Sequence, residues 1–260
     1  MLKVAWGDGF FSCSTQTLVA ILKYFNENKE LPTELDTSSQ YTWYKRPTDG
    51  DITFTYFKPY DTFNIEYTSD VNITYENRED QFSNYKHLQF KNLKPFITKY
   101  FSPSDIILSH IQEIEEKYYI KDYTNMCVLF YRGNDKVRET PICTYEEVIK
   151  KAYHVLSENL NVRFLIQSDE TEFIERMLHE FPNRSFYLND HIRHITKSNT
   201  TVDKIYESSN YMFSQYYLAI TLIMSKCKYV VCGSGNCSLW IVLFRGNAEN
   251  TYQFLNDGWV

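Results

Sequence analysis

The chain has 260 residues, of which 27 are basic and 33 are acidic, so its formal net charge is −6. Hydrophobic residues make up 43% and charged residues 23%, which is typical of a folded globular protein and excludes a disordered chain. The acidic balance argues against a nucleic-acid-binding protein, and no apolar stretch is long enough for a membrane helix. We therefore expect no nucleic acid partner and no membrane segment.

The first half of the chain combines a few recognisable elements with a long ambiguous stretch. Its apolar patterns predict a strand over 2–6, a helix over 10–25 and a helix over 103–120. Between 34 and 85, tyrosine, threonine and aspartate alternate in short segments, which we interpret as strands and loops. The segment 52–57 is the clearest of these expected strands.

The second half alternates strands and helices regularly. Strands are predicted over 126–130, 161–167, 185–188 and 228–232, with helices over 171–181 and 208–225, a helix after Thr144, and a short helix ending at 244. Thr144 and Glu147 have the spacing of a helix capping box. Such alternation implies a parallel sheet covered by helices, and we expect two α/β halves, 1–120 and 121–260.

Polar or glycine-rich loops follow three of the predicted strands, at 132–136, 168–169 and 234–238. Parallel sheets bind ligands at the carboxyl ends of their strands, and glycine-rich loops that open helices bind phosphate through backbone N–H groups. Arg132 stands at one strand end, where a guanidinium can bind a diphosphate bidentately. Together the loops predict a nucleotide diphosphate site, although each loop alone is compatible with a tight turn, and Arg132 alone with a surface salt bridge.

Several segments resemble the peptide motifs of the fucosyltransferase superfamily, which includes α1,6-, nodulation and protein O-fucosyltransferases. Residues 130–139 (FYRGNDKVRE) are similar to its first motif, 164–169 (FLIQSD) to its second, 224–238 (MSKCKYVVCGSGNCS) to its third, and 7–12 (GDGFFS) to its amino-terminal Gly-Phe loop. The three later motifs stand in the order and spacing expected of that family. The middle of the first half matches no motif of the family.

The resemblance implies a GT-B-like α/β fold with two Rossmann-type halves that contain parallel sheets. In this arrangement 121–260 binds the nucleotide-sugar donor, and 1–120 lies on the acceptor side. The implied activity is an inverting, metal-independent transfer of L-fucose from GDP-fucose to a glycan hydroxyl. The nucleotide sugar and the glycan acceptor are then the only partners implied, and no further cofactor is expected.

Motif positions also imply roles for individual residues. Arg132 corresponds to the β-phosphate ligand, Glu139 to the general base, and Lys136 to a residue that assists it. The remaining implied donor-binding residues are Gly9, Phe10, Phe11, Ser12, Phe130, Asp135, Ser168, Asp169, Ser234, Gly235 and Asn236. No metal ligands are implied, and the pair His191 and His194 lacks the partners of a metal site.

Two positions depart from the family pattern. Phe130 replaces a histidine and Ile220 replaces an acid, and in relatives both positions contact the nucleoside. Apolar residues there predict a weaker preference for guanine over uracil. Two alternatives therefore stay open: a glycosyltransferase that uses another nucleotide sugar, such as a UDP-pentose, and a non-catalytic nucleotide- or carbohydrate-binding module on the same fold.

The cysteines and the start of the chain bear on the compartment. None of the six cysteines forms a CxxC motif, and most stand in apolar stretches, so we expect reduced, buried thiols. Residues 1–9 contain glycines where a signal peptide needs an apolar segment. We therefore expect a soluble cytoplasmic enzyme of bacterial or viral type. The acceptor, the linkage and the oligomeric state have no signature in the sequence.

Overall fold

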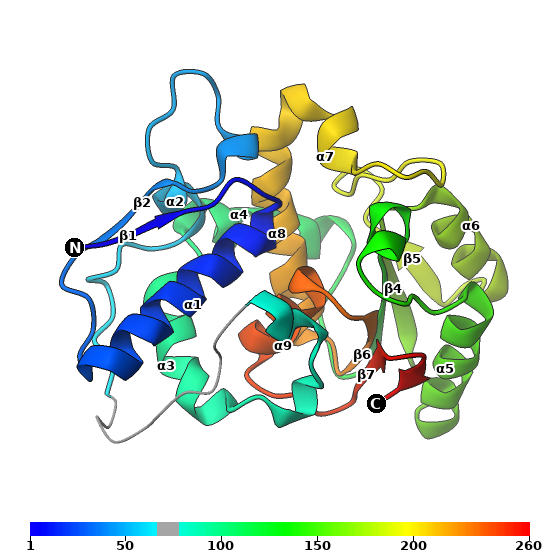
Figure 1. The fold of residues 1–260 in the computed structure, drawn as a ribbon. Helices are drawn as coiled ribbons and strands as arrows, with labels where there is room; N and C mark the ends of the chain where they lie inside the picture. The colour runs from blue at the N-terminus through cyan, green and yellow to red at the C-terminus, as the bar shows by residue number, and fades with distance from the viewer. Residues whose placement is uncertain (67–77) are drawn as a thin grey trace.

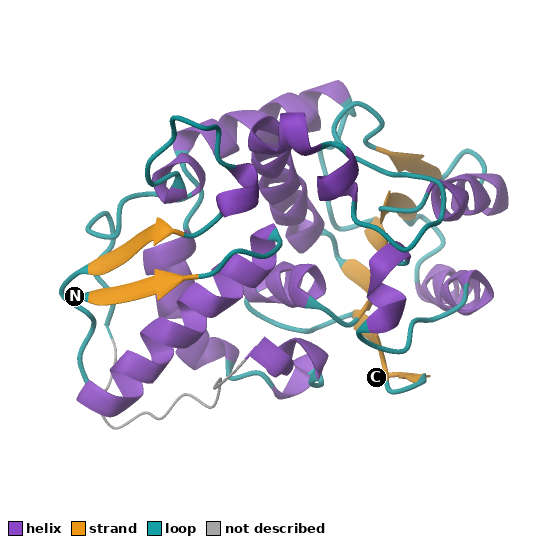
Figure 2. Ribbon diagram, turned by 45° about the horizontal axis from the view of Figure 1, so that its top comes forward, coloured by secondary structure: helices purple, strands orange, loops and turns teal. Residues whose placement is uncertain are grey.

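The computed structural model describes residues 1–66 and 78–260. Part of the ambiguous 34–85 stretch, 67–77, thus lies outside the described residues. The elements form two groups that pack side by side: a mainly helical amino-terminal half and a carboxy-terminal half built on a sheet (Figures 1 and 2). The expected boundary at 120/121 falls between the last helix of the first group and the first strand of the second, and it stays a prediction.

The carboxy-terminal half contains a six-stranded sheet in the order β5-β4-β3-β6-β7-β8. Its strands are β3 (Met126–Tyr131), β4 (Arg163–Ser168), β5 (Ser185–Tyr187), β6 (Tyr229–Gly233), β7 (Thr251–Leu255) and β8 (Gly258–Trp259). All neighbouring strands run parallel except β7 and β8. The chain order reverses between β3 and β6, which makes the carboxyl ends of these two strands the switch point of the sheet, where such folds bind ligands.

The predicted strands and helices of this half are confirmed, with small changes at their ends. Its helices are α5 (Tyr145–Glu158), α6 (Thr171–Glu180), α7 (Val202–Ile205), α8 (Asn210–Lys226) and α9 (Asn236–Arg245). The capping box at Thr144 and Glu147 is present at the start of α5. The strands β7 and β8, at one side of the sheet, and the short helix α7 were not predicted from the sequence.

The amino-terminal half has far less sheet than expected. Its elements are β1 (Leu2–Ala5), α1 (Phe10–Asn28), β2 (Leu35–Ser39), α2 (Thr53–Tyr56), α3 (Phe90–Phe101) and α4 (Asp105–Lys117), with 3₁₀ turns at Thr42–Tyr44, Arg78–Phe82 and Tyr85–His87. Only β1 and β2 pair, in parallel, among the described residues (Figure 2). The parallel sheet expected here therefore exists, but it has two strands.

The expected strand at 52–57 is wrong, because most of this segment is the helical turn α2. The Asp51 carboxylate accepts a hydrogen bond from the Thr53 N–H (2.8 Å), which favours a turn at this point. Thr53 and Tyr56 are buried while Phe54 is exposed, a spacing of three that fits a helix and not a strand.

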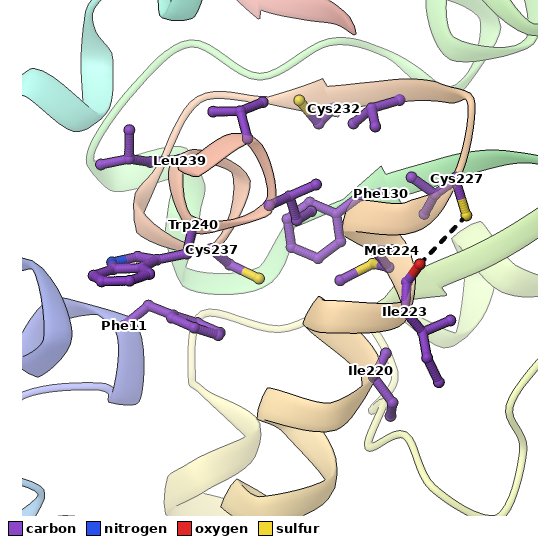
Figure 3. Close-up of a cluster of buried hydrophobic side chains, with 14 of the residues drawn as sticks. Phe11, Phe130, Ile220, Ile223, Met224, Cys227, Cys232, Cys237, Leu239 and Trp240 are labelled. Atoms are coloured by element: carbon purple, nitrogen blue, oxygen red, sulfur yellow. Dashed lines mark hydrogen bonds between the residues drawn. The ribbon is translucent and has the colours of Figure 1, made fainter. Parts of the chain in front are cut away.

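One hydrophobic core runs through both halves. Trp240 of α9 lies at the junction, where its ring faces that of Phe11 of α1 (Figure 3). The centre of the Trp240 ring is 6.1 Å from that of Phe11 and 4.6 Å from that of Phe101 of α3. Its indole N–H donates to Thr15 (2.9 Å), so a polar bond crosses the same junction. The two halves are therefore held together by buried contacts on several elements.

Two further expectations can be checked against the fold. All six cysteines are free and buried, as the sequence indicates. In the ranges 1–66 and 78–260, each helix is too short or too polar to cross a bilayer.

Candidate functional site

A cleft of about 260 Å³ opens at the carboxyl ends of β3 and β6, between the two halves. Most of the residues implied by the family motifs line it: Gly9, Phe10, Phe11, Ser12, Phe130, Arg132, Asp135, Lys136, Glu139, Ser234, Gly235 and Asn236. Segments more than 200 residues apart in the chain are thus brought to one place. Ser168 and Asp169 line a smaller adjoining recess instead.

Arg132 directly follows β3 and is held by two carboxylates. Its Nε donates to Asp169 Oδ2 (2.8 Å) and its Nη2 donates to Asp135 Oδ1 (3.1 Å). Burial lowers the pKa of Arg132, but the nearby carboxylates outweigh it and keep that pKa well above its ordinary value. Among the described residues, Nη1 has no hydrogen-bond partner, so the guanidinium keeps donors for a ligand.

Asp169 acts on this loop from the end of β4. Besides holding Arg132, its carboxylate accepts from the Gly133 N–H (3.1 Å), and its carbonyl accepts from the side chain of Asn134 (2.7 Å). A Cβ on Gly133 would lie 1.9 Å from the Glu170 carboxylate, so any other residue there would displace the buried Glu170 side chain. Asp169, in the second motif, therefore holds the loop of the first motif in its shape. Contact between Asp169 and the donor stays a prediction.

Lys136 and Glu139 form an ion pair on the wall of the cleft, with Nζ 2.6 Å from Oε2. Lys136 is buried, which lowers the pKa of its ammonium. Its side chain packs against Gly235, where a Cβ would come within 2.7 Å of Lys136 Cε. Gly235 also has φ = +147°, a conformation that other residues rarely adopt.

The N-terminus of α9 faces the cleft directly after Gly235. The N–H groups of Asn236, Cys237 and Ser238 precede the first intrahelical bond, which joins Leu239 N–H to Gly235 O (2.9 Å). Within residues 1–66 and 78–260 they have no hydrogen-bond partner, so they are available to an anion at the positive end of the helix. The hydroxyl of Ser234, in contrast, already donates to the Phe254 carbonyl (2.8 Å), so only its backbone is available to a ligand.

A second helix, α1, begins at the same cleft. Gly9 precedes it, the Phe10 N–H donates to the Tyr44 hydroxyl (2.8 Å), and the Ser12 hydroxyl accepts from the indole of Trp6 (3.0 Å). Thr15, one turn further along, donates to the Asn236 side chain (2.8 Å). The start of α1 is thus tied to the start of α9.

Tyr85 joins the amino-terminal half to the glycine-rich loop. Its hydroxyl accepts from the Gly235 N–H (3.0 Å) and lies 3.1 Å from the Gly235 carbonyl and 2.9 Å from the Gln81 carbonyl. The Tyr85 ring is buried. No sequence pattern pointed to this tyrosine, which lies 150 residues before the loop that it supports.

Asp203 of α7 was also missed by the sequence analysis, because no motif surrounds it. It lines both the cleft and the recess, and it accepts from the hydroxyl of Tyr44 (3.3 Å). Burial raises the pKa of its carboxyl above the ordinary value, although the positive charges of Arg132 and Arg193 act in the opposite direction.

The histidine pair singled out in the sequence does not form a metal site. His191 lies 3.5 Å from Glu113, whereas His194 contacts the hydroxyl of Thr171 (2.8 Å). Across the part of the chain that the structure describes, no three His, Cys, Asp or Glu side chains are grouped so that they could hold a metal ion.

Comparison with known proteins gives a result for the fold alone. No family model and no curated protein sequence matches the chain. A NodZ α-1,6-fucosyltransferase soaked with GDP-fucose superposes with a TM-score of 0.53 at 10% identity, covering 94% of this chain and 91% of that one. A NodZ α-1,6-fucosyltransferase co-crystallised with GDP superposes with a TM-score of 0.53 at 12% identity, covering 94% of this chain and 90% of that one. For the fucosyltransferase NodZ from Bradyrhizobium the TM-score is 0.50 at 11% identity, with 88% of this chain and 86% of that one covered.

The chain therefore has the mixed α/β, GT-B-like fold of these fucosyltransferases, over nearly its whole length. At such low identity the likeness concerns the backbone and leaves the chemistry to the residues of the cleft. The fold class expected from the motifs is confirmed, and so is their resemblance to fucosyltransferases at the level of the fold.

Proposed function

We propose that the chain is a glycosyltransferase that transfers L-fucose from GDP-fucose to a hydroxyl of a glycan. One observation carries this proposal: two helix N-termini, of α1 and α9, meet two cationic side chains, Arg132 and Lys136, in one cleft at the switch point of the sheet. Helix N-termini and guanidinium groups are the groups that bind diphosphates in proteins. The solved structures with this fold include one soaked with GDP-fucose and one with GDP, which supports the same donor here.

In this proposal the diphosphate of the donor lies between Arg132 and the first turn of α9. Arg132 is already oriented by Asp169 and Asp135, so it binds the β-phosphate without first being ordered. The N–H groups of Asn236, Cys237 and Ser238 bind further phosphate oxygens. Residues 121–260 then hold the donor, and residues 1–120 face the acceptor.

The transfer is a single displacement with inversion at the anomeric carbon of fucose. The bond between that carbon and the β-phosphate oxygen breaks as the acceptor oxygen forms a new bond to it, and GDP leaves with the electron pair. Glu139 takes the proton of the acceptor hydroxyl. Because Glu139 lies 2.6 Å from Lys136 in the free protein, the acceptor has to compete with this ion pair for the carboxylate.

We propose that this reaction needs no metal ion, because cationic groups already stand where negative charge develops. Arg132 and the end of α9 stabilise the departing diphosphate, the task for which many transferases use a divalent cation. The six buried thiols fit a reducing compartment, so we also propose a cytoplasmic location.

The test is a direct assay of donor binding and turnover with the purified protein. We expect GDP-fucose to bind in calorimetry and to release GDP when a pool of glycan acceptors is added. Tighter binding and turnover of a UDP-sugar would favour another nucleotide sugar as donor. Binding of GDP-fucose without release of GDP, with or without acceptors, would favour a non-catalytic binding module. Failure of every nucleotide to bind would overturn the proposal.

A further inference from the structure

A narrow recess leads from the cleft toward the end of β4, and none of the family motifs accounts for it as a whole. Its volume is about 30 Å³, which leaves room for the edge of a ligand and not for a whole ring. Phe130, Arg132, Asp203 and Tyr217 line both the recess and the cleft, so the two spaces adjoin.

Two buried hydrogen-bond acceptors beside this recess have no partner among the described residues. They are Oδ1 of Asp203 and Oε1 of Gln167, and neither is in contact with solvent. A buried acceptor without a donor costs free energy. Both residues line the recess, so a ligand whose N–H groups reach these two atoms would supply the missing donors.

The walls of the recess suit a flat, aromatic ligand. The rings of Phe213 and Tyr217 are stacked at 5.6 Å, and the Arg193 guanidinium lies 4.0 Å from the centre of the Phe213 ring. The Arg193 side chain is already bound to Asn210 (2.6 Å) and Ser209 (2.6 Å), which engages two of its five N–H donors. The recess thus contains two unpartnered acceptors, and Arg132, which lines both spaces, keeps donors of its own.

The two departures from the family pattern do not decide the choice of base in this arrangement. Ile220 is fully buried in the core and lines neither the cleft nor the recess (Figure 3). Phe130 lines both spaces but carries no polar group. Base recognition must then come from other side chains.

We propose that Asp203, with Gln167 beside it, reads the nucleobase of the donor by accepting hydrogen bonds from the N–H edge of guanine. This inference rests on the proposed function, because it concerns the donor of that reaction. Guanine carries a ring N–H and an adjacent amino group on one edge, whereas uracil has a single ring N–H between two carbonyls. Two unpartnered acceptors therefore fit guanine, and the preference for guanine is retained through residues outside the family motifs.

The experiment compares GDP, inosine diphosphate and UDP by calorimetry on the wild type and on Asp203→Asn. Inosine diphosphate lacks the amino group of guanine and is otherwise equal to GDP. The wild type should bind GDP at least tenfold more tightly than either of the other two. Asp203→Asn should weaken GDP at least tenfold and change UDP less than threefold.

Two further variants test the second acceptor and provide a control. Gln167→Leu removes the second acceptor at similar size and should also weaken GDP more than UDP. Asp190→Asn removes a surface carboxylate that lines neither space and is paired with Lys117, and it should leave all three affinities unchanged. Melting temperatures without ligand show that each variant is folded.

The possible outcomes separate this inference from the proposed function. An equal loss of GDP and UDP binding in Asp203→Asn would mean that Asp203 contacts the ribose or supports the fold, and it would overturn the inference. Unchanged GDP binding in Asp203→Asn would overturn the inference alone and leave the proposed function standing. Failure of the wild type to bind any nucleotide would overturn both.

Discussion

The two halves of the molecule contribute different kinds of groups to one cleft. The carboxy-terminal half supplies most of the charged side chains, among them Arg132, Lys136 and Asp203, from loops and turns around a regular sheet. The amino-terminal half supplies the first residues of α1 and the Tyr44 hydroxyl, while the Tyr85 hydroxyl supports Gly235. Both cationic side chains come from one half, and Gly235, which packs against Lys136, is held in part by the other.

This difference explains why three of the four motif resemblances lie in the carboxy-terminal half. A site that binds its ligand through a guanidinium requires an arginine at one position of the chain, since the charge and the N–H donors of that side chain contact the ligand directly. A supporting hydroxyl can come from any segment that reaches the same point. The amino-terminal half therefore has few residue-by-residue constraints that a motif could reveal.

The largest expected effect comes from the charged half. Arg132→Ala removes a preorganised donor to the diphosphate and should lower the transfer rate by a factor of about 10² to 10³. Arg138→Ala is the matched control, because Arg138 is exposed in the same loop and lines neither space. Steady-state GDP release by both variants checks this, and near wild-type turnover by Arg132→Ala would contradict the role of the guanidinium.

Gly235→Ala should have the next largest effect, on both stability and binding. The new Cβ would meet Lys136 at 2.7 Å and force an unfavourable φ, so we expect a loss of roughly 1–3 kcal/mol in unfolding free energy. Gly233→Ala, two residues earlier, has open space around the new Cβ and serves as the control. Urea denaturation of both variants measures the difference, and equal losses would argue against the contact with Lys136.

Tyr85→Phe tests whether the amino-terminal half supports the charged half. Loss of the hydroxyl leaves the buried N–H of Gly235 without its partner, which should cost about 1–2 kcal/mol of stability. GDP affinity should fall as well, since the same loop binds the diphosphate. Tyr119→Phe alters an exposed tyrosine and should change neither quantity. If Tyr85→Phe binds GDP as the wild type does, the two halves are less dependent on each other than we argue.

Asp203→Asn should stabilise the free protein even though it weakens GDP binding. The folded-state pKa of Asp203 is raised above an unfolded value near 3.9, so the folded state holds the proton more tightly. The ionised carboxylate of Asp203 therefore destabilises the folded state. This effect is absent below about pH 3.9 and increases as the pH rises toward and through the raised folded-state pKa. We expect the variant to unfold at a higher temperature than the wild type at pH 7 and at the same temperature at pH 3. Thermal unfolding across this pH range measures it, and a gain that is independent of pH would rule out the carboxylate as its source.

The smallest expected effect is that of a chelator. If cationic side chains and helix ends of the protein stabilise the leaving diphosphate, EDTA should leave the rate of GDP release unchanged within a factor of two. Added Mg²⁺ should not raise this rate after dialysis. A strict dependence on Mg²⁺ or Mn²⁺ would mean that the charges in the cleft do not suffice for the reaction.

Local signals in the sequence predicted most of the sheet and the charged part of the site. The buried runs of β3 and β6 are continuous and apolar, and the capping box at Thr144 is a short-range pattern, so both can be read without tertiary information. Asp203 and Tyr85 have no such pattern, since their importance arises from contacts with residues far along the chain. The prediction of a strand at 52–57 was wrong because alternating residues in a short segment also fit a helical turn.

The paired hydrogen bonds between Tyr85 and Gly235 have a consequence for the course of binding. They hold the glycine-rich loop in place while the cleft is empty, so the loop has little conformational freedom to lose when a nucleotide arrives. Association should then be a single kinetic step whose observed rate increases linearly with nucleotide concentration, without a slow phase of loop closure. The glycine-rich end of the cleft is therefore preorganised: it has its binding conformation before the nucleotide is present.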